Sequence, residues 1–267
     1  MNNSKEDSEI MPVLFVGHGS PMNAIEENEF VKAWRDLGNS LPRPKAILCI
    51  SAHWETRGTF VTAMAKPKTI HDFSGFPKEL YDVIYSAPGS PELASETKRK
   101  ITITGIELDE TWGLDHGAWS VIKHMYPLAD IPVFEMSLDH TQAPLYHYEL
   151  AKELSFFRKN NVLVLGSGNI VHNLRMIAWD RADNKEYGYN WALTANEIIK
   201  DLIKSDNHDE LINYERLGRE ILMAVPSAEH FLPLLYILAL KEENEPVLFF
   251  NDKAVMGSLT MTSLRIG

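Results

Sequence analysis

The chain has 267 residues, of which 45% are hydrophobic and 24% charged, and its net charge is −11. This composition is typical of a folded globular protein and excludes the disordered, collagen-like and coiled-coil classes. The excess of acidic residues argues against binding to nucleic acid or to an anionic membrane, because both require a surplus of basic residues. The single cysteine, Cys49, excludes an internal disulfide, and its apolar neighbours indicate a small core residue.

The chain shows neither a signal peptide nor a membrane-spanning segment. The first residues, MNNSKEDSEI, are polar, and we expect residues 1–10 to form a flexible tail before a single domain over residues 11–267. This segment lacks the apolar core of a signal peptide. The longest apolar-rich stretch, Phe231–Leu240, is too short to span a bilayer. The sequence therefore predicts a cytoplasmic protein and gives no indication of its oligomeric state.

Short apolar runs alternate with longer amphipathic segments along the chain. Continuous apolar runs of strand length are typical of strands buried on both faces of a sheet. Such strands are predicted at Val13–Val16, Ala46–Ile50, Ile131–Phe134 and Val162–Leu165, with others at Val247–Phe250 and Ser258–Ile266. Helices are predicted at Glu26–Leu37 with Gly38 as C-cap, from Pro91 after the N-cap Ser90, and at Ala143–Lys159, Trp191–Lys204 and Phe231–Leu240. This alternation predicts an α/β fold: one three-layer α/β/α domain with a mostly parallel or mixed central sheet.

Four of the ten histidines occupy similar positions relative to these elements. His18 and His53 follow the first two predicted strands, His172 follows the fourth after a predicted tight turn at Gly166–Asn169, and His230 opens the last predicted helix. Ligands of open α/β sheets bind outside the carboxyl ends of the strands, so we expect the three imidazoles that follow strands, those of His18, His53 and His172, to converge there. Small residues around each one leave room for a ligand, which favours a site over isolated hydrogen-bonded loop histidines.

Competing motifs are incomplete. Ser20 does not lie in a G-x-S-x-G elbow, and Val171 replaces the third glycine of a dinucleotide fingerprint. Ser167 remains a weak candidate nucleophile. Imidazoles without thiolates suit zinc, iron, copper or nickel. Two histidines with a carboxylate would indicate a non-haem Fe(II) oxygenase, whereas three histidines with a water would indicate a zinc hydrolase or hydratase, and spacing alone leaves this choice open.

Taken together, six motifs carry a family resemblance. They are Gly17-His18-Gly19-Ser20-Pro21-Met22, Ser51-Ala52-His53-Trp54, His71-Asp72-Phe73-Ser74-Gly75-Phe76-Pro77, Asp115-His116-Gly117, Asn169-Ile170-Val171-His172-Asn173-Leu174 and Glu229-His230-Phe231-Leu232-Pro233-Leu234-Leu235. In this order, from about Met11 to Gly267, the chain resembles the class III (LigB-type) extradiol ring-cleavage dioxygenases, and within them the 4,5-DOPA dioxygenase branch. The resemblance implies that residues 11–267 form one catalytic domain.

The resemblance also implies roles for the histidines. His18 and His53 resemble two metal ligands, and His230 resembles the third, although relatives that use a glutamate leave Glu229 as the alternative. Glu229 would otherwise contact the N-terminus of the following helix. His172 resembles the active-site base, and it is also counted as a metal neighbour in zinc-loaded members of the branch.

One further histidine is implied in the site. His116 resembles a histidine near the substrate or oxygen, and the alternative for it is a hydrogen bond with Asp115. Phe73 and Phe76, in the loop His71–Pro77, are candidate walls for an aromatic ring, although packing explains them equally well.

The implied cofactor is one non-haem divalent metal, with Fe(II) expected for activity and Zn(II) as an alternative occupant of the purified protein. The implied partners are O₂ and a small-molecule catechol such as L-DOPA, held side by side at the metal, with His172 hypothesised to take a phenolic proton. Two other functions stay open: a zinc-dependent hydrolase on the same histidines, and a non-enzymatic interaction module similar to the Memo proteins.

Overall fold

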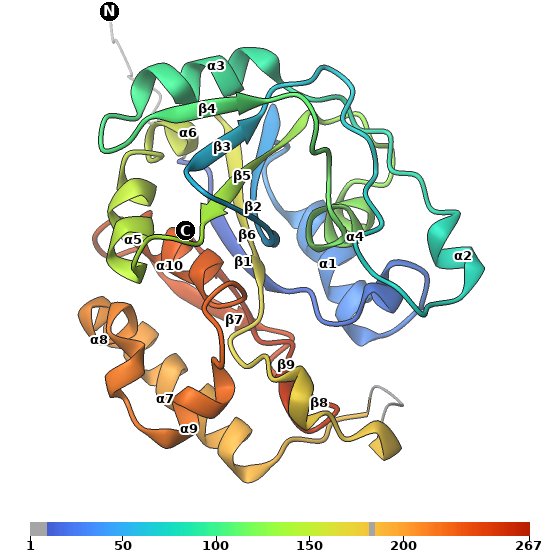
Figure 1. Cartoon of the computed structure of the whole chain (residues 1–267), viewed down its shortest axis with the longest axis vertical. Helices are drawn as coiled ribbons and strands as arrows, with labels where there is room; N and C mark the ends of the chain where they lie inside the picture. Colours follow the sequence, from blue (N-terminus) through green and yellow to red (C-terminus); the bar gives the residue numbers. More distant parts are fainter. Residues whose placement is uncertain (1–9, 182–184) are drawn as a thin grey trace, which may run out of the picture.

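A computed structural model describes residues 10–181 and 185–267 (Figure 1). Within them lies an eight-stranded sheet of order β4-β3-β5-β2-β6-β1-β10-β7. Its four central strands run parallel to one another: β5 (Val133–Asp139), β2 (Ala46–Thr56), β6 (Val162–Gly168) and β1 (Val13–Gly17). The sheet is therefore parallel at its centre, as predicted for strands with continuous apolar runs.

The flanks of the sheet make it mixed. On one side, β10 (Ser263–Ile266) pairs antiparallel with both β1 and β7 (Val247–Phe250). On the other side, β3 (Thr59–Thr62) pairs antiparallel with β5 and parallel with β4 (Ile106–Asp109). A separate two-stranded sheet consists of β8 (Ala254–Val255) and β9 (Leu259–Thr260).

Both faces of the large sheet are covered, which confirms the predicted three-layer α/β/α arrangement (Figure 1). Successive side chains of a strand point to opposite faces. In β1, Val13 and Phe15 belong to one buried cluster, whereas Leu14 and Val16 belong to the other. The helices divide in the same way. The Leu14 face is covered by α1 (Glu29–Ser40), α2 (Lys78–Tyr81) and α4 (His116–Met125), next to the short helix η1 (Pro21–Ala24). The Phe15 face is covered by α3 (Pro91–Lys100), α5 (Pro144–Lys152), α6 (Phe156–Lys159), α7 (Asn190–Lys204), α8 (His208–Ile212), α9 (Arg219–Ala224) and α10 (Leu232–Ala239).

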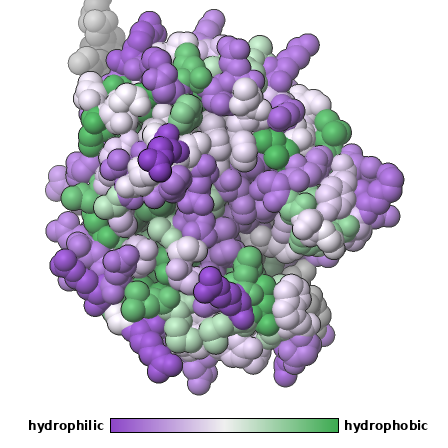
Figure 2. Space-filling model, viewed as in Figure 1, coloured by the Kyte–Doolittle hydropathy of each residue, from purple (hydrophilic) through white to green (hydrophobic). Residues whose placement is uncertain are grey.

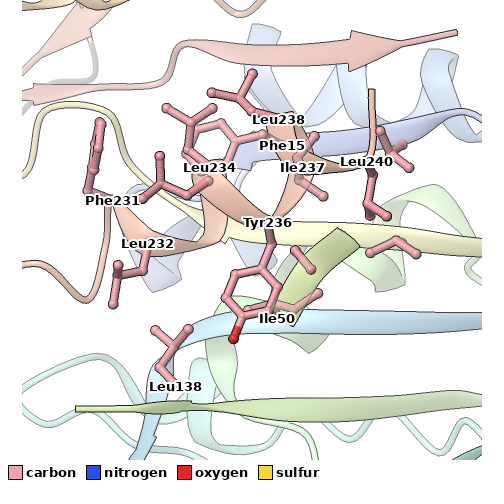
Figure 3. Packing of buried hydrophobic residues seen from close by; sticks show 14 of the residues in the cluster. Phe15, Ile50, Leu138, Phe231, Leu232, Leu234, Tyr236, Ile237, Leu238 and Leu240 are labelled. Carbon is pink, nitrogen blue, oxygen red and sulfur yellow. The ribbon is translucent and has the colours of Figure 1, made fainter. Parts of the chain in front are cut away.

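Helix α10 is the centre of the Phe15 face. It is hydrophobic all round, as is typical of a helix buried on every side. Leu234, Tyr236 and Ile237 are fully buried, and they pack over the sheet near Phe15 (Figure 3). Each such side chain contributes roughly 1.5–3 kcal/mol of burial free energy. The start of α10, and with it His230, is therefore held firmly against the sheet.

Glycines of β6 allow this close packing. A Cβ at Gly168 would lie 2.2 Å from the carbonyl oxygen of His230, and one at Gly166 would lie 2.6 Å from that of Pro233. The predicted tight turn at Gly166–Asn169 is therefore wrong for its first three residues, because β6 continues through Gly168. These glycines let β6 pass close to the backbone at His230 and Pro233, and they do not form a turn.

Two other boundaries differ from the prediction. Strand β2 continues past Ile50 to Thr56, with a register shift against β5, so His53 lies inside a strand and not in a loop after it. Helix α1 begins at Glu29 and runs through Gly38 to Ser40. A Cβ at Gly38 would lie 2.4 Å from the carbonyl oxygen of Met125. Gly38 therefore permits close contact with the end of α4 and is not a C-cap.

Two predicted elements are divided. The predicted helix Ala143–Lys159 separates into α5 and α6, because Leu154 and Phe157 make i→i−3 backbone hydrogen bonds to Ala151 and Leu154 that interrupt the α-helical pattern. The predicted strand Ser258–Ile266 separates into β9 and β10, which belong to different sheets.

The remaining sequence predictions concern the N-terminus and the surface. The predicted tail lies outside the described residues except for Ile10. No helix among the described residues is long and apolar enough to cross a membrane. On the face seen in Figure 2, hydrophilic residues predominate and hydrophobic ones form small separate groups, in keeping with the high charge of the chain.

Candidate active site

Three of the predicted histidines meet at one edge of the sheet. His18 directly follows β1, His53 lies in β2 and His230 lies two residues before the first residue of α10. Nε2 of His18 lies 3.1 Å from Nε2 of His53, and one nitrogen from each of the three rings lies within 4.8 Å of the others. His18 and His230 are only 2% and 6% exposed. The structure thus brings together residues that more than two hundred positions of sequence separate.

Backbone contacts explain this convergence. The amide of His18 donates to the carbonyl of Gly168 at 3.1 Å and extends the pairing of β1 with β6. The amide of Asn169 donates to the carbonyl of His230 at 2.9 Å. The same end of β6 therefore positions both histidines, which makes the site a product of the parallel centre of the sheet.

In each ring, Nδ1 faces an acceptor. Ser167 donates its hydroxyl to the carbonyl of Gly117 at 2.6 Å, so it accepts from Nδ1 of His18 at 3.0 Å. Nδ1 of His230 lies 3.1 Å from the Glu229 carboxylate, and Nδ1 of His53 faces the Asp72 carboxylate at 3.4 Å. A proton on each Nδ1 leaves the Nε2 lone pair free.

The free nitrogens fit a metal ion. Nε2 of His230 is buried and has no hydrogen-bond partner among the described residues. The Nε2 lone pairs of His18 and His53 face each other at 3.1 Å, which is repulsive unless a cation lies between them. Two nitrogen ligands about 2.1 Å from one ion and at about a right angle would be about 3 Å apart. The donor set therefore suits one divalent ion that prefers imidazole.

The pKa values keep these rings neutral. Burial, together with the neighbouring histidines, lowers the pKa of His18 and of His230 well below the usual value. Burial also lowers the pKa of His53 to about 3, with a further lowering by the charge of His116. A neutral imidazole is the form that coordinates a metal, so no proton needs to leave before an ion binds.

Glu229 lies behind His230. It accepts hydrogen bonds from Nδ1 of His230 and from the hydroxyl of Ser227 at 2.9 Å. The interpretation of Glu229 as a helix cap is wrong, because Phe231 is the N-cap residue of α10 and no side chain caps that helix. Of the two candidates for the third ligand, only His230 belongs to the group that contains His18 and His53.

His172 stacks on His230. The two ring centroids are 3.4 Å apart and the rings are inclined by only 9°. The amide of His172 donates to the carbonyl of Ala224, and the residue is half-buried. Burial lowers its pKa to about 4. Its ligand nitrogen groups with Glu229 and His230 but not with His18 or His53, so it lies beside the three-histidine centre.

His116 is the first residue of α4 and lies against His53, with ring centroids 3.9 Å apart. Its Nδ1 donates to Asp72 at 2.8 Å, and its amide donates to the other Asp72 oxygen at 2.9 Å. The alternative of a hydrogen bond with Asp115 is wrong, because Asp115 caps α4 by accepting from the amide of Ala118. Asp72 was not predicted as a partner of His116, and its only signal in the sequence was its place in the His71–Pro77 motif.

The loop His71–Pro77 forms one side of the site. Phe73 packs edge-to-face on His116 with centroids 5.6 Å apart, and Phe76 packs on Phe73 at 5.4 Å. Trp119 of α4 also contacts Phe73 and donates its indole N–H to the carbonyl of Ile70. Phe73 therefore lies beside the histidines, whereas Phe76 supports it from behind.

Comparison with known proteins identifies the chemistry of this arrangement. Residues 12–262 match the family described as the catalytic LigB subunit of aromatic ring-opening dioxygenase. The chain belongs to the LigB dioxygenase family. It is 45% identical over 262 residues to the 4,5-DOPA dioxygenase extradiol of Escherichia coli K12, covering 96% of this chain and 95% of the relative. It is 35% identical to the enzyme of the same name from Beta vulgaris, covering 89% and 90%.

A solved structure is similar to this chain over almost its whole length. The crystal structure of an uncharacterized protein from Escherichia coli K12 superposes with a TM-score of 0.83 at 39% identity, covering 96% of this chain and all of the other. These findings confirm the predicted family and the predicted extradiol dioxygenase class. They give no support to a zinc hydrolase or to an interaction module.

Two acidic side chains are buried behind the site of this dioxygenase. Asp115 and Glu135 are both fully buried, and Glu135 accepts from the amide of Asp115 at 3.0 Å. Asp115 also accepts from the hydroxyl of Ser51 at 2.6 Å. Burial, and next the charge of Asp115, raises the pKa of Glu135 well above the usual value. The surroundings of Glu135 therefore favour its neutral form.

This pair makes stability depend on pH. Unfolded glutamate titrates near pH 4.3, so above that pH the folded state holds a proton that the unfolded state has lost. Stability from Glu135 is thus complete below about pH 4.3 and falls by up to about 1.4 kcal/mol per pH unit as the pH rises toward the folded pKa. Glu135→Gln keeps the shape and removes this loss. We expect the variant to gain stability relative to the parent as the pH rises above about 4.3, measured by urea unfolding at a series of pH values.

The control is Glu107→Gln, at an exposed glutamate of β4 that pairs only with Lys98 at the surface. Its difference from the parent should stay within about 0.5 kcal/mol at each pH. A pH-independent difference for Glu135→Gln would show that Glu135 is ionised in the folded protein.

Proposed function

We propose that this dioxygenase opens the ring of a catechol beside its two hydroxyls, using O₂ and one Fe(II) ion held by His18, His53 and His230. The observation that carries the proposal is the meeting of three imidazoles, with one nitrogen of each within 4.8 Å of the others and Nε2 of His18 3.1 Å from Nε2 of His53. The family membership supports the reaction class. Bound Fe(II) would hold both reactants together and let electron density pass between them.

Hydrogen-bond acceptors behind His18 and His230 support their proposed role as ligands. Ser167 and Glu229 accept the Nδ1 protons of His18 and His230, which holds each ring in one tautomer and one orientation. Acceptors of this kind also make the opposite nitrogen a better donor to a metal.

His172 is proposed as the base. A phenol titrates near 10, so a catechol must lose a proton to a protein group before it can bind as an anion. Burial lowers the pKa of His172 to about 4, and its ring stacks on that of His230; both observations support a neutral base beside a catechol bound at the three histidines. It would take the proton of one hydroxyl and return it later in the reaction. His116, on the other side of His53, is proposed to hydrogen-bond to the substrate or oxygen.

The proposed substrate is a catechol such as L-DOPA, since the relatives are named for that activity. Phe73 is the proposed wall against one face of the aromatic ring, because it packs beside His116. We keep Zn(II) as an alternative occupant of the purified protein. The sequence-based predictions of a cytoplasmic enzyme and of one catalytic domain over residues 11–267 belong to the same proposal.

The test is reconstitution without oxygen. The metal-free protein is loaded with Fe(II), given catechol, L-DOPA, dopamine or protocatechuate, and then exposed to air while absorbance and oxygen uptake are recorded. We expect a yellow product and one O₂ consumed per catechol with Fe(II), and no turnover with Zn(II). Hydrolysis of esters or amides by the zinc-loaded protein would favour the hydrolase instead. Metal-independent binding of a protein partner without either activity would favour the interaction module.

A further inference from the structure

A single carboxylate contacts two histidines of the site. Oδ2 of Asp72 accepts from Nδ1 of His116 at 2.8 Å and lies 3.4 Å from Nδ1 of His53, while Oδ1 accepts from the amide of His116 at 2.9 Å. We propose that Asp72 is a positioning residue that sets the tautomer and ring orientation of both histidines at once. The proposal rests on the proposed function, in which His53 binds the metal and His116 faces the substrate.

Asp72 is itself held in place. Its side chain is only 16% exposed, although it lies in a loop. On one side of it Ile70 accepts from the indole of Trp119, and on the other side Phe73 packs on Trp119 and on His116. The carboxylate also lies at the N-terminus of α4, where the helix dipole favours a negative charge. The loop therefore presents a preorganised acceptor to the two rings.

The contacts of Asp72 suit this role. The amide of His116 can only donate, so Oδ1 of Asp72 accepts from it at 2.9 Å, while Oδ2 faces Nδ1 of His116 at 2.8 Å and Nδ1 of His53 at 3.4 Å. An acceptor at this place favours a proton on Nδ1 of each ring. For His53 this leaves Nε2 free to face Nε2 of His18 at 3.1 Å.

A purely structural role would have different consequences. If Asp72 only fastens the loop to α4, its loss lowers stability but leaves the imidazole tautomers and the metal affinity unchanged. If Asp72 positions the histidines, its loss frees His53 to carry its proton on Nε2, and that tautomer cannot coordinate a metal through Nε2. Outer-shell partners of this kind are typically worth 10–100-fold in metal affinity.

The test compares Asp72→Asn and Asp72→Ala with the parent. The amide keeps the size but turns one acceptor into a donor, whereas alanine removes both acceptors without adding a donor. Anaerobic titration with Co(II) gives the metal affinity, and long-range ¹H–¹⁵N spectra of histidine-labelled protein give the tautomers. We expect both variants to bind Co(II) roughly 10–100-fold more weakly. We also expect the Nδ1–H signatures of His53 and His116 to change.

The matched control is Asp82→Asn, since Asp82 is exposed and pairs with Lys78 at the surface, just beyond the same loop. It should bind Co(II) like the parent. Unchanged Co(II) affinity and unchanged tautomers in both Asp72 variants would overturn the proposal, even if their melting temperatures fall. These readouts need no turnover, so they decide the role of Asp72 even if the parent protein cleaves none of the catechols.

Discussion

His18→Ala is expected to abolish stable metal binding and to lower kcat/KM for a catechol by more than ~100-fold, because loss of a partner behind a ligand already costs 10–100-fold. His18 is nearly buried at the centre of the site, and its Nε2 lies 3.1 Å from that of His53. Two imidazoles would remain, with one coordination position opened to water. Metal content after dialysis against Fe(II) and the initial rate of oxygen uptake measure the two effects.

The fold should survive this substitution. Ser167, which accepts from Nδ1 of His18, keeps its hydrogen bond to the carbonyl of Gly117. The backbone hydrogen bond from the amide of His18 to Gly168 is also retained. His208→Ala is the matched control, because this half-buried histidine of α8 contacts Tyr148 away from the site. Full metal occupancy in His18→Ala would remove the basis for the three-histidine centre.

The strand pattern was sufficient to predict that His18 and His53 meet at one edge of the sheet, whereas His230 was expected in the site only from the family resemblance. Parallel strands present their carboxyl ends at one edge, and apolar runs identify parallel strands, so His18 was predicted at the correct edge. The residues behind the ligands were beyond this reasoning. Ser167 is 149 positions from His18, and Asp72 is 44 positions from His116. No local pattern specifies which of many serines and aspartates will accept from a given imidazole.

The wrong strand ends have a common physical cause. The apolar run predicted at Ile131–Phe134 stops at a glutamate, yet β5 continues to Asp139. Glu135 is tolerated there because it accepts from the amide of Asp115 and because burial raises its pKa, which favours the neutral form. The glycines of β6 similarly looked like a turn, although they are required by the carbonyl of His230. Near the site, strands therefore continue through charged residues and glycines, which a hydrophobicity pattern takes as the end of a strand.

His172→Ala is expected to lower kcat for catechol cleavage by ~10²–10⁴-fold, the usual contribution of a general base, while metal content stays near that of the parent. The reason is the position of His172. Its ring lies flat on His230 at 3.4 Å, but its ligand nitrogen does not group with His18 or His53. Single-turnover absorbance after rapid mixing separates catechol binding from ring opening.

The metal content decides between the two roles of His172. Loss of metal together with activity would make His172 a ligand, whereas turnover at the parent rate with normal metal would refute its role as the base. A lower kcat with intact metal leaves proton transfer as the affected step. Catechols with more acidic hydroxyls should then be impaired least by His172→Ala, because they need the base least. A loss that is equal for all catechols would place the effect of His172 outside the proton transfer.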